Sequence, residues 1–587
     1  MTAQTDRTAT PTTPSAAKSP PPASQAEERE LSGSAANGSP LDVMLTDAST
    51  GPLRRALSPS AGLHLAVALA GRPRVVLRRG AEVAAELGRV VAGRSEVAPD
   101  KKDKRFADPA WETNALLHRI EQAYLVAARG AEQLVGEAEL DWRSDQRVRF
   151  SLMMLTDALS PSNSPILNPA ALRAAVDTGG RNYAVGLKQL AGDMRHSPRI
   201  PQMVDSDPFE VGGNIAVTPG AVVLRTPVLE LMHYRPTTAT VRELPLLVVP
   251  PMVNKYYVAD LAPGRSMVEH FVGAGQQVFA ISWRNPGVEQ RDWGLDAYAG
   301  AVIEALDAVQ EITGAGKAQL FGLCAGGIVT SCALNALAAR GQLGRVAGLM
   351  LGVTMLDQEK SGTIGAMVDE RTAAKAIADS AKRGYLDGKA LAGVFAWLRP
   401  NDLIWSYWVN NYLLGKKPPA FDVLFWNADV TRMPAALHRD FIELAMDNAL
   451  VHPDKATVLG RPVDLSTIDV DSYIVAGVSD HICPWENCYR STALLGGKSR
   501  FVLSSSGHIA ALINPPGGKS SFQVNDALPA DPEQWLAGAE RHPGSWWVDY
   551  AAWLGERSGS AKPAPTALGS AAHPVGQAAP GSYVLEK

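Results

Sequence analysis

The chain has 587 residues, of which 46% are hydrophobic, and this is enough apolar material for a large core. Its formal net charge of −4 at pH 7 gives no sign of a nucleic-acid partner. Four cysteines are too few for a disulfide framework and favour a reducing, cytoplasmic setting. The first apolar stretch, AGLHLAVALAG from Ala61, is too short to span a bilayer, so we expect neither a transmembrane segment nor a signal peptide.

The first 213 residues form three segments that differ in amino-acid composition. Residues 1–60 are rich in Ser, Thr, Pro and Ala and are predicted to be disordered. Residues 61–107 alternate short apolar and basic stretches and predict a flexible basic arm, with a marginal helix that settles only against a partner; an arm without any role fits equally well. Residues 108–213 predict a mainly helical domain, because WETNALLHRIEQAYLVAARGAEQLV places apolar residues at helical spacing.

Strands alternate with helices over residues 214–557, which predicts an α/β domain with a mostly parallel sheet covered on both faces. Its apolar runs include PLLVVPPMVN, QQVFAISW, KAQLFGL, VAGLMLGVTML and SYIVAGV. The alternation breaks at about 360–445, where Trp and Tyr are frequent, and we interpret this stretch as an inserted cap. The cap is either a lid over an acyl site or a helical core, and both can hold. Residues 558–587 are rich in Ala, Pro and Gly and predict a flexible C-terminal tail.

The segment GLCAGG at residues 322–327 has the form of a nucleophile elbow, G-x-S-x-G, with cysteine in place of serine. A strand, a tight turn and a helix are the context that this motif requires, and the flanking sequences supply it. The helix N-terminus favours a thiolate at Cys324, and the backbone N–H of Ala325 is a candidate oxyanion donor. The motif therefore predicts an α/β-hydrolase fold and acyl transfer through a thioester. A buried cysteine that only packs is the alternative.

Two further residues complete a catalytic triad in the chain order nucleophile, acid, histidine. Asp480 follows the strand SYIVAGV and His508 follows FVLSSSG, at strand ends where functional groups gather. His481 either adds a second polar group to the site or orients the loop. The second oxyanion donor is expected from the backbone N–H of Val253, in the loop PPMVNKYY.

No metal site is expected from the cysteine spacing. Cys483 and Cys488 lie five positions apart, without the matching pair of ligands that a zinc motif would supply.

Longer motifs surround these residues: PPMVNKYYVADLAP, ISWRNP, LRPNDLIWSYWVNNYLLG, FWNADVTRMP, AGVSDHICPW and LSSSGHIAALINPPG. With GLCAGG, they make roughly Asp108 to Ser558 resemble the polyhydroxyalkanoate synthases of the single-chain type. In that family the elbow serine is likewise replaced by cysteine.

The resemblance implies a polymerase of (R)-3-hydroxyacyl-coenzyme A that releases coenzyme A and needs no other cofactor. Cys324 would take the acyl group and His508 would act as its general base. Asp480 would either activate the 3-hydroxyl group or orient His508. His481 and Arg399 match family positions near the substrate channel. The resemblance also implies a homodimer at the surface of polyester granules.

The segments NDLIWSYWVNNYLLG and FDVLFWNADVTRMPAALH look most like the class II synthases, which prefer medium-chain monomers. Two other functions compete with this one. The first is an intracellular depolymerase or thioesterase of the same fold, which would usually carry serine at the elbow, so Cys324 argues against it. The second is a non-catalytic granule-binding protein that uses the aromatic segments, which would not need Cys324, Asp480 and His508 together.

Overall fold

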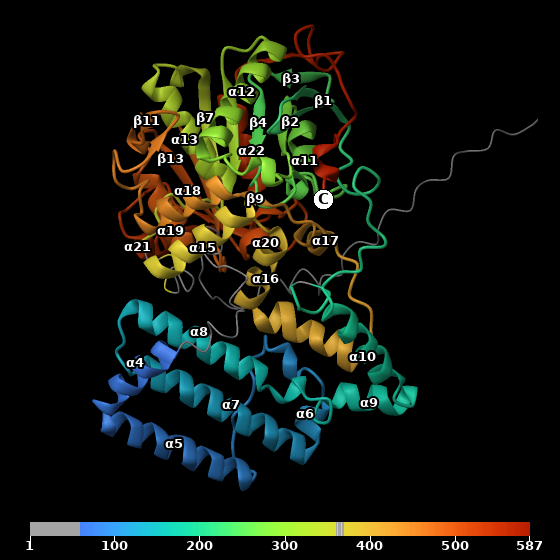
Figure 1. Ribbon diagram of the computed structural model, residues 1–587, viewed down its shortest axis with the longest axis vertical. Coiled ribbons are helices and arrows are strands. Elements are labelled where there is room, and N and C mark those ends of the chain that lie inside the picture. Colours follow the sequence, from blue (N-terminus) through green and yellow to red (C-terminus); the bar gives the residue numbers. More distant parts are fainter. Residues whose placement is uncertain (1–58, 197, 360, 362–365, 367–368) are drawn as a thin grey trace, which may run out of the picture.

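The computed structural model describes residues 59–587, except for 197, 360, 362–365 and 367–368. It consists of an α/β body and a layer of helices built from the N-terminal part of the chain, with cap helices between them (Figure 1). The disorder predicted for residues 1–60 falls almost entirely outside the described residues. None of the helices in the described ranges is long and apolar enough to cross a membrane.

A ten-stranded sheet forms the centre of the body, in the order β1-β2-β5-β4-β6-β7-β12-β13-β14-β15. The six strands from β5 to β13 are parallel, whereas two antiparallel strands lie at each edge. The predicted fold class is therefore confirmed. The strands are β1 (Gly220–Arg225), β2 (Leu229–Tyr234), β4 (Leu246–Val249), β5 (Val278–Trp283), β6 (Ala318–Leu323), β7 (Val346–Gly352), β12 (Ser472–Gly477), β13 (Ser499–Ser504), β14 (Ser521–Val524) and β15 (Glu540–Pro543).

Helices cover both faces of the sheet, as strand β6 shows. Phe321 contacts Phe271 of α11 (Met267–Gly273) and Tyr550 of α22 (Trp546–Arg557). The next residue, Gly322, faces α13 (Ala325–Ala339), which packs beside α12 (Leu295–Thr313). Successive residues of a strand point to opposite faces, so the two helix pairs lie on opposite sides. This burial on both faces explains the continuous apolar runs in the sequence.

The N-terminal layer contains α4 (Pro59–Ala70), α5 (Pro73–Val91), α6 (Ala110–Thr113), α7 (Ala115–Gly136), α8 (Trp142–Ala158), α9 (Pro169–Thr178) and α10 (Arg181–Asp193). The prediction of a flexible arm at residues 61–107 is therefore wrong, because α4 packs on α8 and α5 packs on α7. Val83 fits against Gly130, where a Cβ would clash, and the Nε of Arg79 donates to Glu137 at 2.9 Å. The partner that settles this marginal helix is the chain's own α7.

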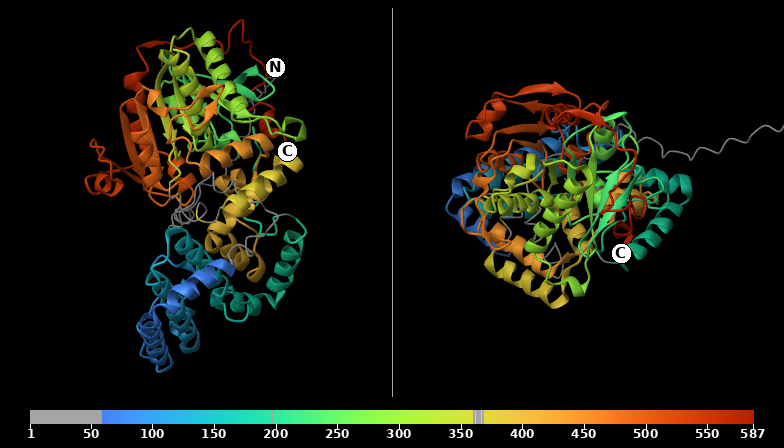
Figure 2. Two further views of the ribbon diagram at one scale, coloured as in Figure 1. Left: turned by 60° about the vertical axis from the view of Figure 1, so that its left-hand side comes forward. Right: turned by 90° about the horizontal axis from the view of Figure 1, so that it is seen from above.

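The cap comprises α15 (Glu370–Arg383), α16 (Gly388–Leu398), the π-helical turns η6 (Asn401–Trp405) and η7 (Trp408–Leu413), α17 (Asp422–Ala428) and α18 (Ala435–Met446). The short strands β8 (Tyr385–Leu386) and β9 (Met433–Pro434) pair within it. The left-hand view of Figure 2, like Figure 1, shows cap helices between the body and the N-terminal layer. The indole N–H of Trp408 donates to the Asn163 carbonyl at 3.1 Å, so the aromatic cap is partly a docking surface for the N-terminal helices.

The prediction of a flexible tail at residues 558–587 is also wrong, because this C-terminal segment is bound along the body. Strand β16 (Ala561–Pro563) pairs with β3 (Thr240–Arg242), and the amide of Gly576 donates to Val222 of the edge strand β1 at 2.8 Å. The amides of Ser582 and Tyr583 each donate to the buried Glu230 carboxylate at 2.9 Å. The segment thus covers a sheet edge, which proteins generally protect from further pairing.

Truncation after Val575 is expected to lower the melting temperature by several degrees and to promote self-association. It removes three charge-assisted hydrogen bonds from Glu230, given by the amides of Ser582 and Tyr583 and by the Ser582 hydroxyl, a loss of about 4.5 kcal/mol or more, and it uncovers the edge of β1. Thermal unfolding and size-exclusion chromatography measure the two effects. Lys587→Ala, which removes one ion pair between an exposed lysine and the largely buried Asp429 and leaves the Glu230 hydrogen bonds in place, is the control. An unchanged melting temperature in the truncated chain would show that the segment contributes nothing.

Candidate active site

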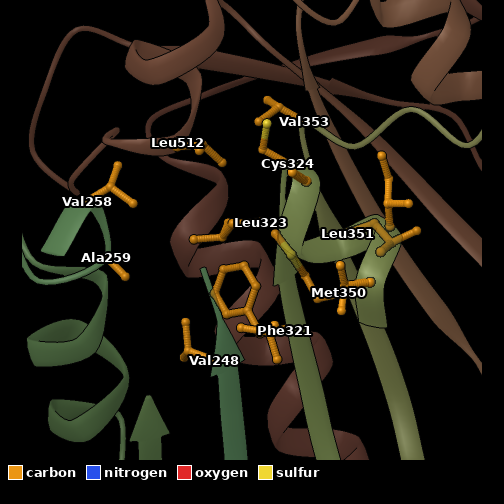
Figure 3. Close-up of a cluster of buried hydrophobic side chains, with 14 of the residues drawn as sticks. Val248, Val258, Ala259, Phe321, Leu323, Cys324, Met350, Leu351, Val353 and Leu512 are labelled. Atoms are coloured by element: carbon orange, nitrogen blue, oxygen red, sulfur yellow. The ribbon is translucent and has the colours of Figure 1, made fainter. Parts of the chain in front are cut away.

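Cys324 stands in the turn between β6 and α13, in a backbone conformation that L-residues rarely adopt, with φ 51° and ψ −122°. The amide of Cys324 donates to the Gly352 carbonyl at 2.8 Å, and the carbonyl of Cys324 accepts the hydroxyl of Thr354 at 3.1 Å. These bonds hold a strained turn that lifts the thiol above the end of β6 (Figure 3). The apolar residues around it in Figure 3, Leu323, Val353 and Leu512, keep bulk water away, and the cysteine is only 7% exposed.

Glycines let the elbow pass close to neighbouring backbone. A Cβ on Gly326 would lie 2.5 Å from the carbonyl oxygen of Pro250, at the end of β4. A Cβ on Gly327 would overlap the hydroxyl of Thr354. The G-x-C-x-G-G pattern therefore has a packing cause, because larger residues at these two positions would push α13 away from the sheet.

Asp480 and His508 meet because their strands are parallel neighbours in register. Asp480 follows β12, and His508 is the first residue of α20 (His508–Leu512), just beyond β13. Nδ1 of His508 lies 2.7 Å from Oδ2 of Asp480. The other oxygen, Oδ1, accepts the amides of Ile482 at 2.8 Å and Cys483 at 2.9 Å. The carboxylate is fully engaged, and it fixes the imidazole so that Nε2 is available to Cys324.

The structure brings a second thiol to the nucleophile. The sulfurs of Cys324 and Cys483 and a ring nitrogen of His508 lie within 4.8 Å of one another, and all three residues are buried. Cys483 is not among the site residues predicted from the sequence, where its spacing to Cys488 marks it only as half of an incomplete zinc motif. A usable signal was present: Cys483 is three positions after Asp480, in the loop that must turn around that carboxylate.

Electrostatics favour a thiolate at Cys324 and an imidazolium at His508. The hydrogen bond from the Cys483 thiol lowers the pKa of Cys324; burial opposes this, and His508 and the Ala325 N–H lower it further. Burial opposes the charged form of His508, but the charge and hydrogen bond of Asp480 outweigh it and raise the pKa of that imidazole. The pKa of Cys483 is raised by burial and by its contact with Cys324, so this second thiol stays protonated.

His481 and Arg399 lie near this centre. Burial, then the positive charges of Arg399 and His508, hold the pKa of His481 well below its ordinary value, so its imidazole is neutral. Nδ1 of His481 is buried and has no hydrogen-bond partner among the described residues. Arg399, which follows α16 of the cap, forms an ion pair with Asp402. The cap therefore places the guanidinium of Arg399 close enough to the triad for its charge to act on His481.

Val253 lies in the loop after β4, and it is buried. Its carbonyl oxygen accepts the amide of Thr431 at 3.4 Å, which ties the loop to the cap. The role of its own N–H as an oxyanion donor stays a prediction.

Comparison with known proteins agrees with this architecture. Residues 102–271 match the family model of the poly-beta-hydroxybutyrate polymerase (PhaC) N-terminus, and residues 257–515 match that of the alpha/beta hydrolase fold. Poly(3-hydroxyalkanoate) polymerase 1 of Ectopseudomonas oleovorans is 46% identical over 503 residues, which cover 86% of this chain and 90% of that protein. Polymerase 2 of the same organism is 45% identical over 86% and 90% of the two chains.

The poly(3-hydroxyalkanoate) polymerase subunit PhaC of Cupriavidus necator is 42% identical over 503 residues, covering 84% of this chain and 85% of that subunit. Similarity at this level over almost the whole length confirms the resemblance inferred from the motifs. Together with the sheet and its elbow, it shows that the chain belongs to the poly(3-hydroxyalkanoate) polymerases, acyltransferases that polymerise hydroxyacyl-coenzyme A and have an α/β-hydrolase fold.

Proposed function

We propose that polymerisation proceeds through a covalent acyl thioester on Cys324, with His508 as general base and Asp480 as the group that orients it. One observation carries the proposal: a ring nitrogen of His508 lies within 4.8 Å of the Cys324 sulfur, while Asp480 holds the same ring at 2.7 Å. This is the relationship of nucleophile, base and orienting acid that acyl-transfer enzymes share.

In the acylation step, the sulfur of Cys324 attacks the thioester carbonyl of (R)-3-hydroxyacyl-coenzyme A. The oxyanion that forms is stabilised by the backbone N–H of Ala325 and, from the β4 loop, that of Val253. The bond to coenzyme A breaks, and His508 supplies the proton that the departing thiolate takes. One thioester replaces another, so the step is close to thermoneutral and needs no cofactor.

In the elongation step, the 3-hydroxyl group of one acyl unit attacks the thioester carbonyl of another. Nε2 of His508 accepts the hydroxyl proton as the ester bond forms and the Cys324 sulfur is released. We assign Asp480 to orientation rather than to direct contact with the hydroxyl, because both of its oxygens are already engaged by His508 and by two backbone amides.

His481 and Arg399 are proposed to bind substrate. The buried, unpartnered Nδ1 of His481 offers a neutral hydrogen-bonding group to the polar atoms of the acyl unit. Arg399 offers a positive charge at the cap, suited to the phosphates of coenzyme A. The apolar cap around them would exclude water and so suppress hydrolysis of the thioester.

We also propose that the enzyme accepts medium-chain monomers, on the strength of the aromatic cap motifs. The test is the composition of polymer made in a host without its own synthase, supplied with both 3-hydroxybutyryl and 3-hydroxyoctanoyl precursors. Polymer enriched in 3-hydroxyoctanoate is expected. Polymer that contains 3-hydroxybutyrate alone would contradict the chain-length assignment and leave the polymerase activity intact.

The reactivity of Cys324 toward iodoacetamide is expected to persist from neutral into mildly acidic pH. A lowered pKa means that the thiolate is present well below pH 9.0, the ordinary value for cysteine, and is lost only as the pH falls through the lowered value. The rate of alkylation, followed by mass spectrometry of the Cys324 peptide, measures this. A rate that continues to rise through pH 9 would show an ordinary thiol. Cys332, buried with a raised pKa, is the internal control.

The proposed setting is a cytoplasmic homodimer at the surface of polyester granules, as in the family that the motifs resemble. Analytical ultracentrifugation of the purified protein tests the dimer, and a fluorescent fusion in polymer-producing cells tests the location. A strictly monomeric active enzyme, or fluorescence spread evenly through granule-filled cells, would contradict the respective assignment.

A further inference from the structure

We propose that Cys324, Cys483 and His508 form a binding site for a thiophilic divalent cation such as Zn²⁺, and that the bound ion reversibly blocks the enzyme. Among the residues that the structure describes, these three bring two sulfurs and one ring nitrogen within 4.8 Å of one another. Binding of the ion follows from this geometry alone. Inhibition rests, in addition, on the proposed role of Cys324 as nucleophile.

The spacing of the ligand atoms suits a tetrahedral ion. Zinc binds sulfur at about 2.3 Å and nitrogen at about 2.0–2.1 Å, so its ligand atoms lie roughly 3.5–3.8 Å apart. Side chains whose ligand atoms are already within 4.8 Å reach that spacing through shifts of about 1 Å or less. A disulfide between the same cysteines would need the sulfurs at about 2.05 Å, a larger movement, so the cluster favours a metal over a cross-link.

The surroundings of the cluster also resemble those of a metal site. A histidine that ligates zinc usually donates its other N–H to a carboxylate, and His508 already faces Oδ2 of Asp480 at 2.7 Å. The same carboxylate accepts the amide of Cys483 at 2.9 Å. Asp480 therefore positions two of the three ligands before any ion arrives. Two sulfurs and one imidazole select zinc or cadmium over magnesium or calcium.

The bound ion would occupy the two atoms on which acyl transfer depends. The Cys324 sulfur could no longer attack a thioester, and Nε2 of His508 could no longer accept a proton. Acylation of Cys324 would in turn remove one ligand, because a thioester sulfur binds zinc poorly. Free enzyme should therefore be sensitive to the ion, whereas enzyme carrying an acyl chain should be protected.

Cobalt binding tests the site without reference to turnover. We expect the reduced, full-length protein to bind one Co²⁺ per chain, with the near-ultraviolet charge-transfer absorption of cobalt–thiolate bonds. Cys483→Val and Cys483→Ser should each weaken binding at least about 100-fold, since loss of a ligand exceeds the 10–100-fold effect of losing an outer partner. Cys332→Val, which changes a buried thiol remote from the cluster, is the matched control and should bind like the wild type.

Inhibition is measured separately, as the Zn²⁺ concentration that halves each variant's own metal-free rate. Zinc should inhibit the wild type reversibly, with activity restored by a chelator, and should inhibit Cys483→Val only at concentrations at least about 100-fold higher. Equal cobalt spectra and equal zinc sensitivity in the wild type and both Cys483 variants would overturn the site. Loss of the cobalt spectrum in those variants without a change in zinc sensitivity would overturn inhibition through Cys324 and preserve the binding site.

Discussion

Replacing Cys324 by alanine is expected to abolish polymer formation, with a fall in rate of at least about 10⁴-fold, since removal of an acyl-transfer nucleophile eliminates the covalent route. The structure gives the residue no substitute, because the neighbouring thiol of Cys483 is held protonated by burial and is not placed on the elbow. Coenzyme A release and polymer yield with (R)-3-hydroxyacyl-coenzyme A measure the effect.

The matched control is Cys332→Ala, which removes a fully buried thiol from the next turns of α13 without touching the triad. It should retain activity within a few-fold, and both variants should keep the wild-type circular dichroism spectrum. Polymer made by Cys324→Ala at more than about a hundredth of the wild-type rate would contradict the assignment, because the loss expected for a nucleophile is far larger.

Replacing Asp480 by asparagine is expected to lower the rate about 10⁴-fold, the loss found when the orienting acid of a triad becomes an amide. The amide would present an N–H or a weaker acceptor to Nδ1 of His508 and stabilise the wrong tautomer. The raised pKa of His508 would fall with the loss of the negative charge that supports it. Because the substitution preserves shape, the two amides that cap Oδ1 can still be satisfied.

The two roles considered for Asp480 predict different half-reactions. If it orients His508, single-turnover release of coenzyme A and chain elongation should both be slow in Asp480→Asn. If it acts directly on the 3-hydroxyl group, the burst of coenzyme A should keep its wild-type rate while elongation fails. Rapid-quench measurement of the burst separates these results, and a normal burst would refute the orienting role proposed here.

The parts of the site that the sequence predicts correctly are those written in local patterns. The strand before Cys324, the glycines after it and the chain order of Asp480 and His508 follow from short stretches of sequence. The parallel register of β12 and β13 then brings the two strand ends together, which the alternation of strands and helices had already implied.

The parts that it missed depend on partners far away in the chain. Residues 61–107 were expected to be flexible because of their basic, weakly apolar composition, but Arg79 finds its counter-charge on Glu137 of α7. The Ala- and Pro-rich tail was expected to be loose for the same reason, yet its amides are bound by Glu230. Composition indicates how much apolar surface a segment can bury by itself. It does not predict whether the segment packs on another part of the chain.

Cys483 is a third feature that the sequence does not predict, because its role depends on residues far away in the chain. Zinc motifs are recognised from short spacings, whereas this sulfur meets Cys324 and His508 through the ends of three different strands. The loop after a strand that carries a catalytic acid is therefore worth searching residue by residue for further ligands and donors.

The central claim is that the growing chain is attached to Cys324, and peptide mapping of the acylated enzyme tests it most directly. The purified protein would be mixed with (R)-3-hydroxyacyl-coenzyme A, quenched in acid and digested before mass spectrometry. We predict one acyl adduct, on the peptide that contains Cys324, which disappears on treatment with hydroxylamine. An adduct on Cys483 or on any other residue, with Cys324 unmodified while polymer forms, would contradict the account.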